Sequence, residues 1–199
     1  MADFATAYAP LAQYEGGYSN NAADRGGETY AGIARNFFPS WAGWRVIDKW
    51  KNTVGTKPSV LNKALSTVAE LRPLVEDWYR VEWWEKLGLG SLSQKVADEI
   101  FEQTVNLGKG GAAKKVQIVC NAYNFKSGRP LFPDLKVDGA IGPKTLSALR
   151  TIIASHKADE AALVHALNCM QGAHYLELAA KKPSQRVFTS GWMKRTHCE

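Results

Sequence analysis

Cysteine is scarce in this chain, and long apolar runs are missing. The 199 residues include three cysteines, Cys120, Cys169 and Cys198, and none belongs to a Cys-x-x-Cys pair. This odd, scattered set predicts no disulfide framework, which suits synthesis in a reducing compartment. No apolar run approaches the length of a membrane span, so we expect no stable membrane insertion. Residues 1–15 lack the basic start and apolar stretch of a signal peptide, so synthesis in the cytoplasm is expected.

The charge is positive overall but is not concentrated in any one region. The formal net charge is +6, which favours an anionic partner such as nucleic acid, an anionic membrane or a bacterial cell-wall polymer. The strongest clusters are the pairs Lys114-Lys115 and Lys181-Lys182, and no nucleic-acid-binding motif accompanies them. We therefore expect no nucleic acid partner, and a basic adaptor that binds nucleic acid is only an alternative.

Patterns for metal, nucleotide and serine-nucleophile chemistry are also missing. His165 and His174 are nine residues apart, which does not place two zinc ligands on adjacent helical turns. The sequence has no Gly-x-Ser-x-Gly motif, and Gly108-Lys109-Gly110-Gly111 lacks the phosphate-loop pattern. We expect neither a metal nor an organic cofactor.

Helical periodicity dominates the sequence and predicts a mainly α fold. A small β-hairpin is expected where Tyr18 and Glu28-Thr29-Tyr30 are flanked by turn-forming residues. The glycines and serines near Leu87–Ser93 predict the boundary between two closely packed lobes, residues 1–90 and 91–199, in a monomer. Residues 126–140 are expected to form a loop. The expected helices cover about 2–15, 66–86, 92–107, 110–124, a segment that begins at Pro143, and 158–180.

A candidate acid lies at the end of the first expected helix. Phe4, Tyr8, Leu11 and Glu15 share one helical face, which holds the Glu15 carboxyl against apolar surface. Such surroundings disfavour the charged form and raise the pKa of a carboxyl toward that of a general acid. The following Gly16-Gly17 ends the helix and leaves room for a substrate beside the backbone.

Two polar residues after Glu15 complete a candidate catalytic set. Hydrolysis of a sugar–sugar bond needs a proton donor and a group that handles water or the developing positive charge. Asp24, in a polar Gly-rich loop, is expected to stay ionised, and the Thr29 hydroxyl can orient a water. The same segment also fits an ordinary helix cap and turn, in which the Asp24 and Asn20 side chains only form hydrogen bonds with the backbone of the turn. The spacing alone leaves both interpretations open.

Together with its neighbours, this segment resembles the motif of glycoside hydrolase family 108. These are N-acetylmuramidases found as phage endolysins and as bacterial wall-remodelling enzymes. The order of Glu15, Asp24 and Thr29 is also similar to the triad of phage-type lysozymes, which usually have one more residue before the threonine. The segments that carry the resemblance are Glu15-Gly16-Gly17-Tyr18, Asp24, Gly26-Gly27-Glu28-Thr29 and Gly32-Ile33.

The resemblance extends through the second half of the chain. Val105–Gly108 matches a family segment, and Val137–Thr145 is similar to a turn of small peptidoglycan-binding modules. The closing motif of the family is matched by Pro183-Ser184-Gln185, Phe188, Gly191-Trp192 and Arg195. The resemblance implies a lysozyme-like helical fold with the β-hairpin near the active site, followed by a C-terminal peptidoglycan-binding region.

The function implied is that of an endolysin-like N-acetylmuramidase that cuts the β-1,4 bond between N-acetylmuramic acid and N-acetylglucosamine in bacterial peptidoglycan. Glu15 is then the general acid, and Asp24 and Thr29 are its partners. Asn106 also fits a structural cap, and the turn before Pro143 also fits a purely structural role. The substrate-binding residues expected from the resemblance are Tyr18, Tyr30, Asn106, Asp138 and Thr145.

Several alternatives stay open at this point. The main rival is a non-catalytic peptidoglycan-binding protein that keeps the fold. The distance between the two carboxyl groups distinguishes inversion from retention, and the sequence does not give it. Phage lysis, secretion and wall remodelling all remain compatible with the motifs. We expect the protein to reach the periplasmic wall after a holin-type membrane lesion or through a dedicated export route.

Overall fold

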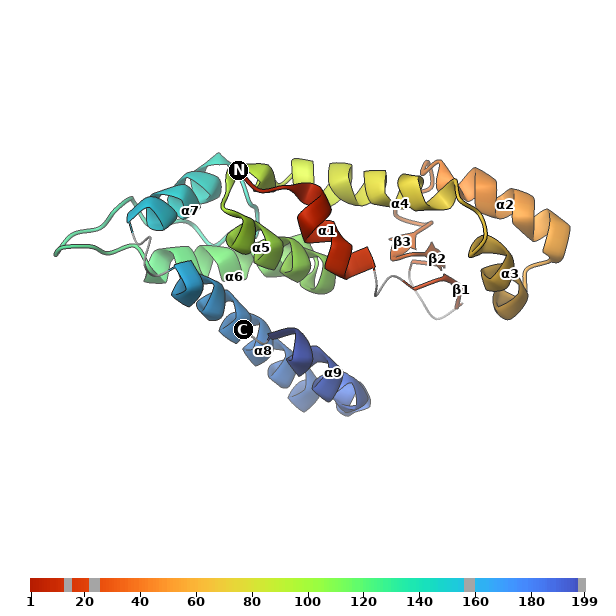
Figure 1. The fold of residues 1–199 in the computed structure, drawn as a ribbon. Coiled ribbons are helices and arrows are strands. Elements are labelled where there is room, and N and C mark those ends of the chain that lie inside the picture. Colours follow the sequence, from red (N-terminus) through yellow and green to blue (C-terminus); the bar gives the residue numbers. More distant parts are fainter. Residues whose placement is uncertain (13–15, 22–25, 156–159, 197–199) are drawn as a thin grey trace. The chain divides into compact units, whose positions relative to one another are not determined.

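The computed structural model describes residues 1–12, 16–21, 26–155 and 160–196 (Figure 1). This described chain is mostly helical and contains a small three-stranded antiparallel sheet. It divides into two compact units, a smaller one of Tyr8–Trp83 and a larger one of Met1–Ala7 and Trp84–Glu199. The predicted mainly α fold with a small hairpin is confirmed.

The smaller unit combines the sheet with three helices. Its strands follow the second half of helix α1, which starts in the larger unit, and its last helix continues into a π-helix, η1, that crosses into the larger unit. The sheet order is β1-β2-β3. The elements are α1 (Phe4–Ala12), β1 (Tyr18–Asn20), β2 (Glu28–Tyr30), β3 (Ile33–Ala34), α2 (Gly43–Val54), α3 (Pro58–Leu65), α4 (Leu71–Tyr79) and η1 (Arg80–Glu85).

A two-residue turn, Ala31-Gly32, joins β2 to β3. Both residues have positive φ, 47° and 75°, as a type I′ turn requires. Gly32 suits this conformation, and a Cβ there would lie 2.5 Å from the hydroxyl oxygen of Tyr79. That hydroxyl donates a hydrogen bond to the Ala31 carbonyl at 3.2 Å. Helix α4 therefore fixes the turn of the hairpin.

Aromatic rings form much of the core of the smaller unit. Trp41 and Trp44 are buried with their rings edge to face at 5.3 Å between centroids, and Ile47 is buried three residues after Trp44 in α2. Trp78 packs edge to face against Phe38, at 4.9 Å. These aromatic rings of α4 and of the segment at 38–44 therefore form core.

The described part of the larger unit consists of helices joined by loops, with a long loop at 123–142 between α6 and α7. Helix α5 packs against α6 and α8, and α6 also contacts α7 (Figure 1). The elements are η2 (Leu89–Ser91), α5 (Gln94–Leu107), α6 (Lys109–Ala122), α7 (Pro143–Ser155), α8 (Glu160–Lys181), η4 (Pro183–Phe188), α9 (Thr189–Met193) and η5 (Lys194–Thr196).

The first residues of the chain belong to the larger unit. The Phe4 ring packs edge to face against Trp84 and Phe101, each at 5.9 Å between centroids. The Asp3 backbone N–H donates to Gln94 Oε1 at 2.7 Å, and Gln94 Nε2 donates back to the Asp3 carbonyl at 3.0 Å. Residues far apart in the sequence therefore build this core.

Two helix predictions need correction. The helix expected over 66–86 begins only at Leu71 and changes to the π-helix η1 after Tyr79. Helix α3 is absent from the sequence-based prediction, because it is short and only Leu61 and Leu65 are buried along it. The other predicted helices occur within a few residues of their expected ends. Over the described ranges, no helix is long and apolar enough to cross a membrane.

Candidate active site

Two of the three predicted catalytic residues, Glu15 and Asp24, lie outside the described residues. The third, Thr29, is the central residue of β2 and lies opposite Ser19 on β1 and Ala34 on β3. Its hydroxyl donates to the Gly27 carbonyl at 3.4 Å. Such a long hydrogen bond is weak, so the hydroxyl can turn toward another partner.

The described residues that come soon after each predicted acid are tied to the hairpin. The carbonyl of Gly16, directly after Glu15, accepts a hydrogen bond from the Ala31 N–H at 2.9 Å. The carbonyl of Gly26, which follows Asp24 by two residues, accepts one from the Asn36 N–H at 3.1 Å. The chain is thus anchored to the same small sheet soon after each acid.

A side-chain amide from α3 holds the start of β1. Asn62 Oδ1 accepts the Tyr18 backbone N–H at 2.6 Å, and Asn62 Nδ2 donates to the Tyr18 carbonyl at 2.8 Å. A Cβ at Gly17 would lie 2.2 Å from Asn62 Oδ1, so this approach needs a glycine at position 17. Asn62 was missed by the sequence reasoning, because a lone asparagine on a short helix gives no signal of such a role.

Tyr18, a predicted substrate-binding residue, lies inside the smaller unit. It is 2% exposed, and its hydroxyl donates to Glu28 Oε1 at 2.7 Å. Lys51 Nζ lies 5.8 Å from the centre of the Tyr18 ring. A ring this buried supports its neighbours, such as Glu28, from inside the unit and presents little of its face to a sugar.

Glu28 is the centre of a charged network beside Thr29. Its carboxylate accepts hydrogen bonds from Lys51 and, at 2.8 Å, from Arg35. Arg35 also makes a bidentate pair with Asp48, with both distances 2.7 Å. Burial pushes the pKa of Glu28 up, but the hydrogen bonds from Lys51, Tyr18 and Arg35 outweigh it and lower the pKa overall. Glu28 is therefore an ionised structural carboxylate.

Tyr30 offers an aromatic face in this region. It is half-buried at the end of β2, and its ring stacks on Trp41 at 6.3 Å with an interplanar angle of 22°. Stacked aromatic pairs hold each other in a fixed orientation. Tyr30 is thus placed by the core behind it, in the strand that also carries Thr29.

Asn106, the predicted substrate-binding residue of the larger unit, is engaged by its neighbours. Asn106 Nδ2 donates to Glu102 Oε1 at 2.6 Å, and Asn106 Oδ1 accepts from Arg195 at 2.9 Å. The side chain is exposed near the end of α5. It links α5 to the short C-terminal helix η5, which agrees with the structural alternative for this residue.

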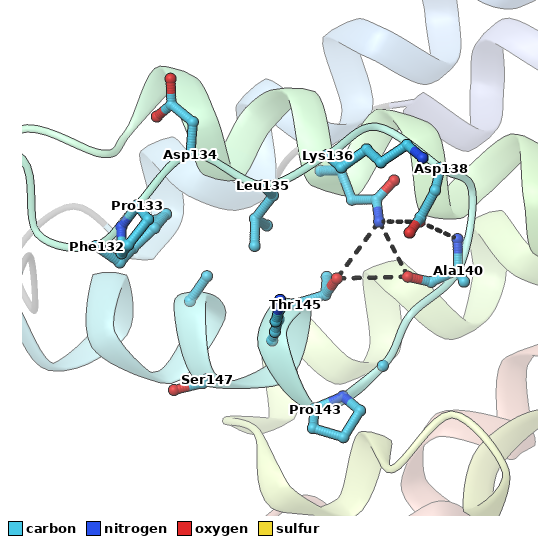
Figure 2. A pocket seen from close by; sticks show the side chains of 14 residues that line it. Phe132, Pro133, Asp134, Leu135, Lys136, Asp138, Ala140, Pro143, Thr145 and Ser147 are labelled. Atoms are coloured by element: carbon cyan, nitrogen blue, oxygen red, sulfur yellow. Dashed lines mark hydrogen bonds between the residues drawn. The ribbon is translucent and has the colours of Figure 1, made fainter.

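Asp138 and Thr145 are brought together around the buried side chain of Gln117 (Figure 2). Gln117 Nε2 donates to Asp138 Oδ1 at 2.7 Å and to the Ala140 carbonyl at 3.0 Å. Thr145 is 3% exposed, and its hydroxyl lies 3.4 Å from the same carbonyl. Both residues line a cavity of about 790 Å³ between the loop that follows α6 and the start of α7.

Metal ligation has no evident location in the described part of the chain. Among residues 1–12, 16–21, 26–155 and 160–196, no group of three or more His, Cys, Asp and Glu side chains is arranged to hold a metal ion.

Comparison with known families decides the class of the protein. Residues 8–108, just over half of the chain, match the family described as Glycosyl hydrolase 108. The chain belongs to glycosyl hydrolase family 108. Residues 115–197 match a second family, described as "Predicted Peptidoglycan domain". The first match covers Thr29 and its hairpin, and the second covers the cavity that contains Asp138 and Thr145.

A solved structure shares the fold of this family 108 chain. It is the structure of Brucella abortus SagA, with 24% sequence identity and a TM-score of 0.58. The similarity covers 97% of this chain and 88% of that chain. A search of curated proteins found no match.

Membership in family 108 makes the protein a glycoside hydrolase that acts on peptidoglycan as an N-acetylmuramidase. It therefore acts at the bacterial cell wall. The choice between an enzyme and a non-catalytic wall-binding protein is settled in favour of the enzyme.

Proposed function

We propose that Glu15 is the general acid of this muramidase and that Asp24 and Thr29 manage the attacking water. The Glu15 carboxyl gives its proton to the glycosidic oxygen as the bond from that oxygen to the anomeric carbon breaks. A water held by Asp24 and Thr29 adds to the anomeric carbon, and its proton passes to Asp24. The ionised Asp24 also stabilises the positive charge that develops on the sugar.

The observation that carries this proposal is the anchoring of the chain beside both acids. Gly16 and Gly26 are hydrogen-bonded to the Ala31 and Asn36 backbones, which lie at the end of β2 and just after β3. Thr29 lies at the centre of β2. The described residues that follow each acid and Thr29 therefore share one small framework, and acid–base chemistry needs such support for its catalytic groups.

The charged network of the same unit supports the choice of Glu15 over its neighbours. Glu28 is bound by Lys51 and Arg35, and its pKa is lowered. The pKa of Asp48 is also lowered, first by its hydrogen bonds from Arg35. A carboxyl with a lowered pKa holds no proton near neutral pH, so neither residue suits the role of the acid.

The substrate-binding roles follow the geometry of the two units. We assign Tyr30 to contact a sugar face, since Trp41 holds its ring from behind. Tyr18 supports the wall through its bond to Glu28. Asn106 takes a structural role, since its side-chain amide pairs with Glu102 and Arg195.

The test is hydrolysis of purified peptidoglycan by Glu15→Gln, with product analysis by mass spectrometry. Glutamine keeps the shape of the side chain but cannot donate an acidic proton, so we expect turnover to fall at least about a thousandfold. Binding to the wall should stay unchanged in a sedimentation assay. Asp24→Asn should lower turnover strongly, and Thr29→Val less so.

Glu70→Gln is the matched control, since Glu70 is an exposed glutamate of the same unit. It should leave turnover unchanged. Retention of turnover by Glu15→Gln would refute the assignment of the acid. Products that end in reducing N-acetylglucosamine would identify a glucosaminidase instead, and released peptides would identify an amidase.

We also propose that the enzyme is a bacteriolytic monomer of the phage endolysin type. Its sequence motif resembles that of phage endolysins, and its net charge of +6 favours binding to an anionic cell wall. Expression inside a bacterial cell should then cause lysis only after the inner membrane is permeabilised. Lysis of intact producing cells without such treatment would point to a dedicated export route, and sedimentation equilibrium would measure the oligomeric state.

A further inference from the structure

The cavity of the larger unit is large enough for a ligand and is formed by the fold itself. Its volume of about 790 Å³ lies within the range of roughly 300–1,000 Å³ that is usual for small-molecule pockets. Its walls come from the loop at 132–142 and the first residues of α7, as Figure 2 shows, and Gln117 of α6 also lines it.

Side-chain amides of α6 hold the loop of this cavity in place. Gln117 and Asn121 lie in α6, Asn124 follows its C-terminal end, and each of the three binds loop backbone. Asn121 pairs with both the N–H and the carbonyl of Leu135, at 2.8 Å each. Asn124 Oδ1 accepts the N–H of Phe132 at 2.9 Å. The cavity is therefore organised before a ligand arrives, which lowers the entropy cost of binding.

The lining combines an apolar interior with charges of both signs at the edge. Leu135, Pro143 and Ala148 contribute apolar surface. Lys136, Lys144 and Asp138 also line the cavity, and all three are exposed. Within the described chain, the two ammonium groups make no hydrogen bond, and Asp138 uses Oδ1 for its contacts with Gln117 and the Ala140 N–H. Asp138 Oδ2 and both lysines can therefore meet a ligand.

Peptidoglycan has two chemically different parts, and this lining suits one of them. Its sugar chain is usually bound through aromatic faces, and the cavity has one aromatic ring, that of Phe132. Its short peptides carry carboxylates, a free ammonium group and small methyl side chains. Charges of both signs at the edge of an apolar cavity complement such a peptide.

We propose that this cavity binds the peptide of peptidoglycan and not its sugar chain. Lys136 and Lys144 pair with peptide carboxylates, Asp138 pairs with the ammonium group, and the apolar interior takes an alanine methyl group. The inference rests on the proposed function, since it takes the bacterial wall as the substrate. It gives the two units separate tasks, with the sugar chain cut in the smaller unit and the peptide held in the larger one.

The test is calorimetric titration of the full-length Glu15→Gln chain with the free tetrapeptide L-alanyl-γ-D-glutamyl-meso-diaminopimelyl-D-alanine. The double variant Lys136→Gln/Lys144→Gln should weaken binding about fivefold to tenfold at low salt, as expected for two partly exposed ion pairs. Lys63→Gln/Lys95→Gln is the matched control, because both lysines are exposed and lie outside the cavity lining. This control should leave the affinity unchanged.

Asp138→Asn tests the ammonium contact separately. Asparagine keeps the oxygen that Gln117 and the Ala140 N–H use, so the turn is preserved, and circular dichroism checks the fold. The variant should bind the free tetrapeptide more weakly than the unchanged protein. It should bind a tetrapeptide with an acetylated ammonium group as well as the unchanged protein does.

Two results would overturn the inference. One is that the tetrapeptide fails to bind, or binds with an affinity that the cavity variants do not change. The other is that the cavity variants weaken binding of a β-1,4 tetrasaccharide of N-acetylglucosamine. Neither result depends on turnover, so failure here differs from failure of the Glu15 assignment, which the hydrolysis assay measures.

Discussion

At the scale of single residues, the chemistry observed for Glu28 is the opposite of the chemistry proposed for Glu15. Glu28 is surrounded by Lys51, Arg35 and the Tyr18 hydroxyl, which keep it ionised. Glu15, which the sequence pattern predicts at the end of an apolar helical face, is the proposed proton donor. Sequence reasoning proposed Glu15 from this periodicity, whereas Glu28 was visible only as part of a family motif. Its cations come from Arg35 and Lys51, 7 and 23 residues away, and spacing alone does not show such pairing.

Glu28→Gln should destabilise the smaller unit, because it leaves Lys51 and Arg35 without their shared carboxylate. The expected loss is about 1–3 kcal/mol of unfolding free energy at neutral pH. A lowered pKa contributes stability above the unfolded-state value of 4.5, and this contribution is lost as the pH falls through the lower folded-state pKa. Urea unfolding near pH 7 and pH 3 would measure this, and the difference between variant and unchanged protein should shrink at the lower pH.

Also at the residue scale, one arrangement of side-chain hydrogen bonds recurs in both units. Four side-chain amides each bind the N–H and the carbonyl of one distant residue, as a neighbouring strand would. Composition predicts polar surface at such positions, so their inward role could not be read from the sequence. The pairs in the described chain are Asn62 with Tyr18, Gln94 with Asp3, Asn121 with Leu135, and Asn124 with Phe132.

At the scale of elements, the sequence predicted where α6 and its loop lie but not how they are joined. The expected helix at about 110–124 agrees with Lys109–Ala122, because its apolar residues recur at helical spacing. Gln117 and Asn124 are nevertheless 2% and 6% exposed. Buried backbone N–H and C=O groups of a loop that do not bond to each other need other hydrogen-bond partners. The Gln117 and Asn124 side-chain amides supply them.

Gln117→Ala should loosen the loop and remove peptide binding together. Gln117 makes hydrogen bonds to Asp138, to the Ala140 carbonyl and to the Gly139 N–H. Loss of three such bonds in a buried place should lower the unfolding free energy by about 2–4 kcal/mol. Ile118→Ala is the control, since Ile118 is the next residue of α6 and is 43% exposed. A thermal melt that separates neither variant from the unchanged protein would contradict this account.

The contact between α5 and α8 contains a second polar group, which the sequence did not reveal. Glu99 accepts hydrogen bonds from Gln103 and Asn168, at 2.6 and 2.7 Å. Burial raises the pKa of Glu99 to about 7, and the nearby Glu102 adds to the rise. Three buried amide oxygens in this contact find no donor among the described residues, those of Gln103, Asn168 and Gln171.

Glu99→Gln should therefore stabilise the protein at alkaline pH. The folded-state pKa lies above the unfolded-state value of 4.5, so the unchanged protein loses stability as the pH rises from that value through about 7. Glutamine stays neutral and can donate to one of the unpaired amide oxygens. We expect a gain of about 1–3 kcal/mol near pH 8 and none near pH 4 in urea unfolding. Equal pH dependence of both proteins would rule this out.

At the scale of the whole molecule, the two compact units are not two consecutive halves of the chain, because the larger unit includes residues from before and after the smaller one. The sequence predicted two closely packed lobes, residues 1–90 and 91–199, and this stays a prediction. The compact units of the structure change at Ala7/Tyr8 and at Trp83/Trp84. A composition-based boundary follows glycine and serine, whereas here the chain crosses within helical segments, where composition gives no signal.

Phe4→Ala should destabilise the larger unit, although Phe4 lies far in sequence from the other residues of that unit that it contacts. Its ring packs on Trp84 and Phe101, and removal of such a ring costs about 2–4 kcal/mol. Phe37→Ala makes the same change at a ring that is 65% exposed, and it should cost little. Denaturant unfolding followed by circular dichroism compares the two, and equal losses would contradict the role of Phe4.

The dependence of the larger unit on the first seven residues also sets an order of events during synthesis. Met1–Ala7 are synthesised before the smaller unit, whereas their partners in α5 are synthesised after it. Met1–Ala7 therefore cannot pack against α5 until about ninety more residues have been synthesised. A bulky tag fused before Met1 would burden this late docking step, whereas the same tag placed after Glu199 would not.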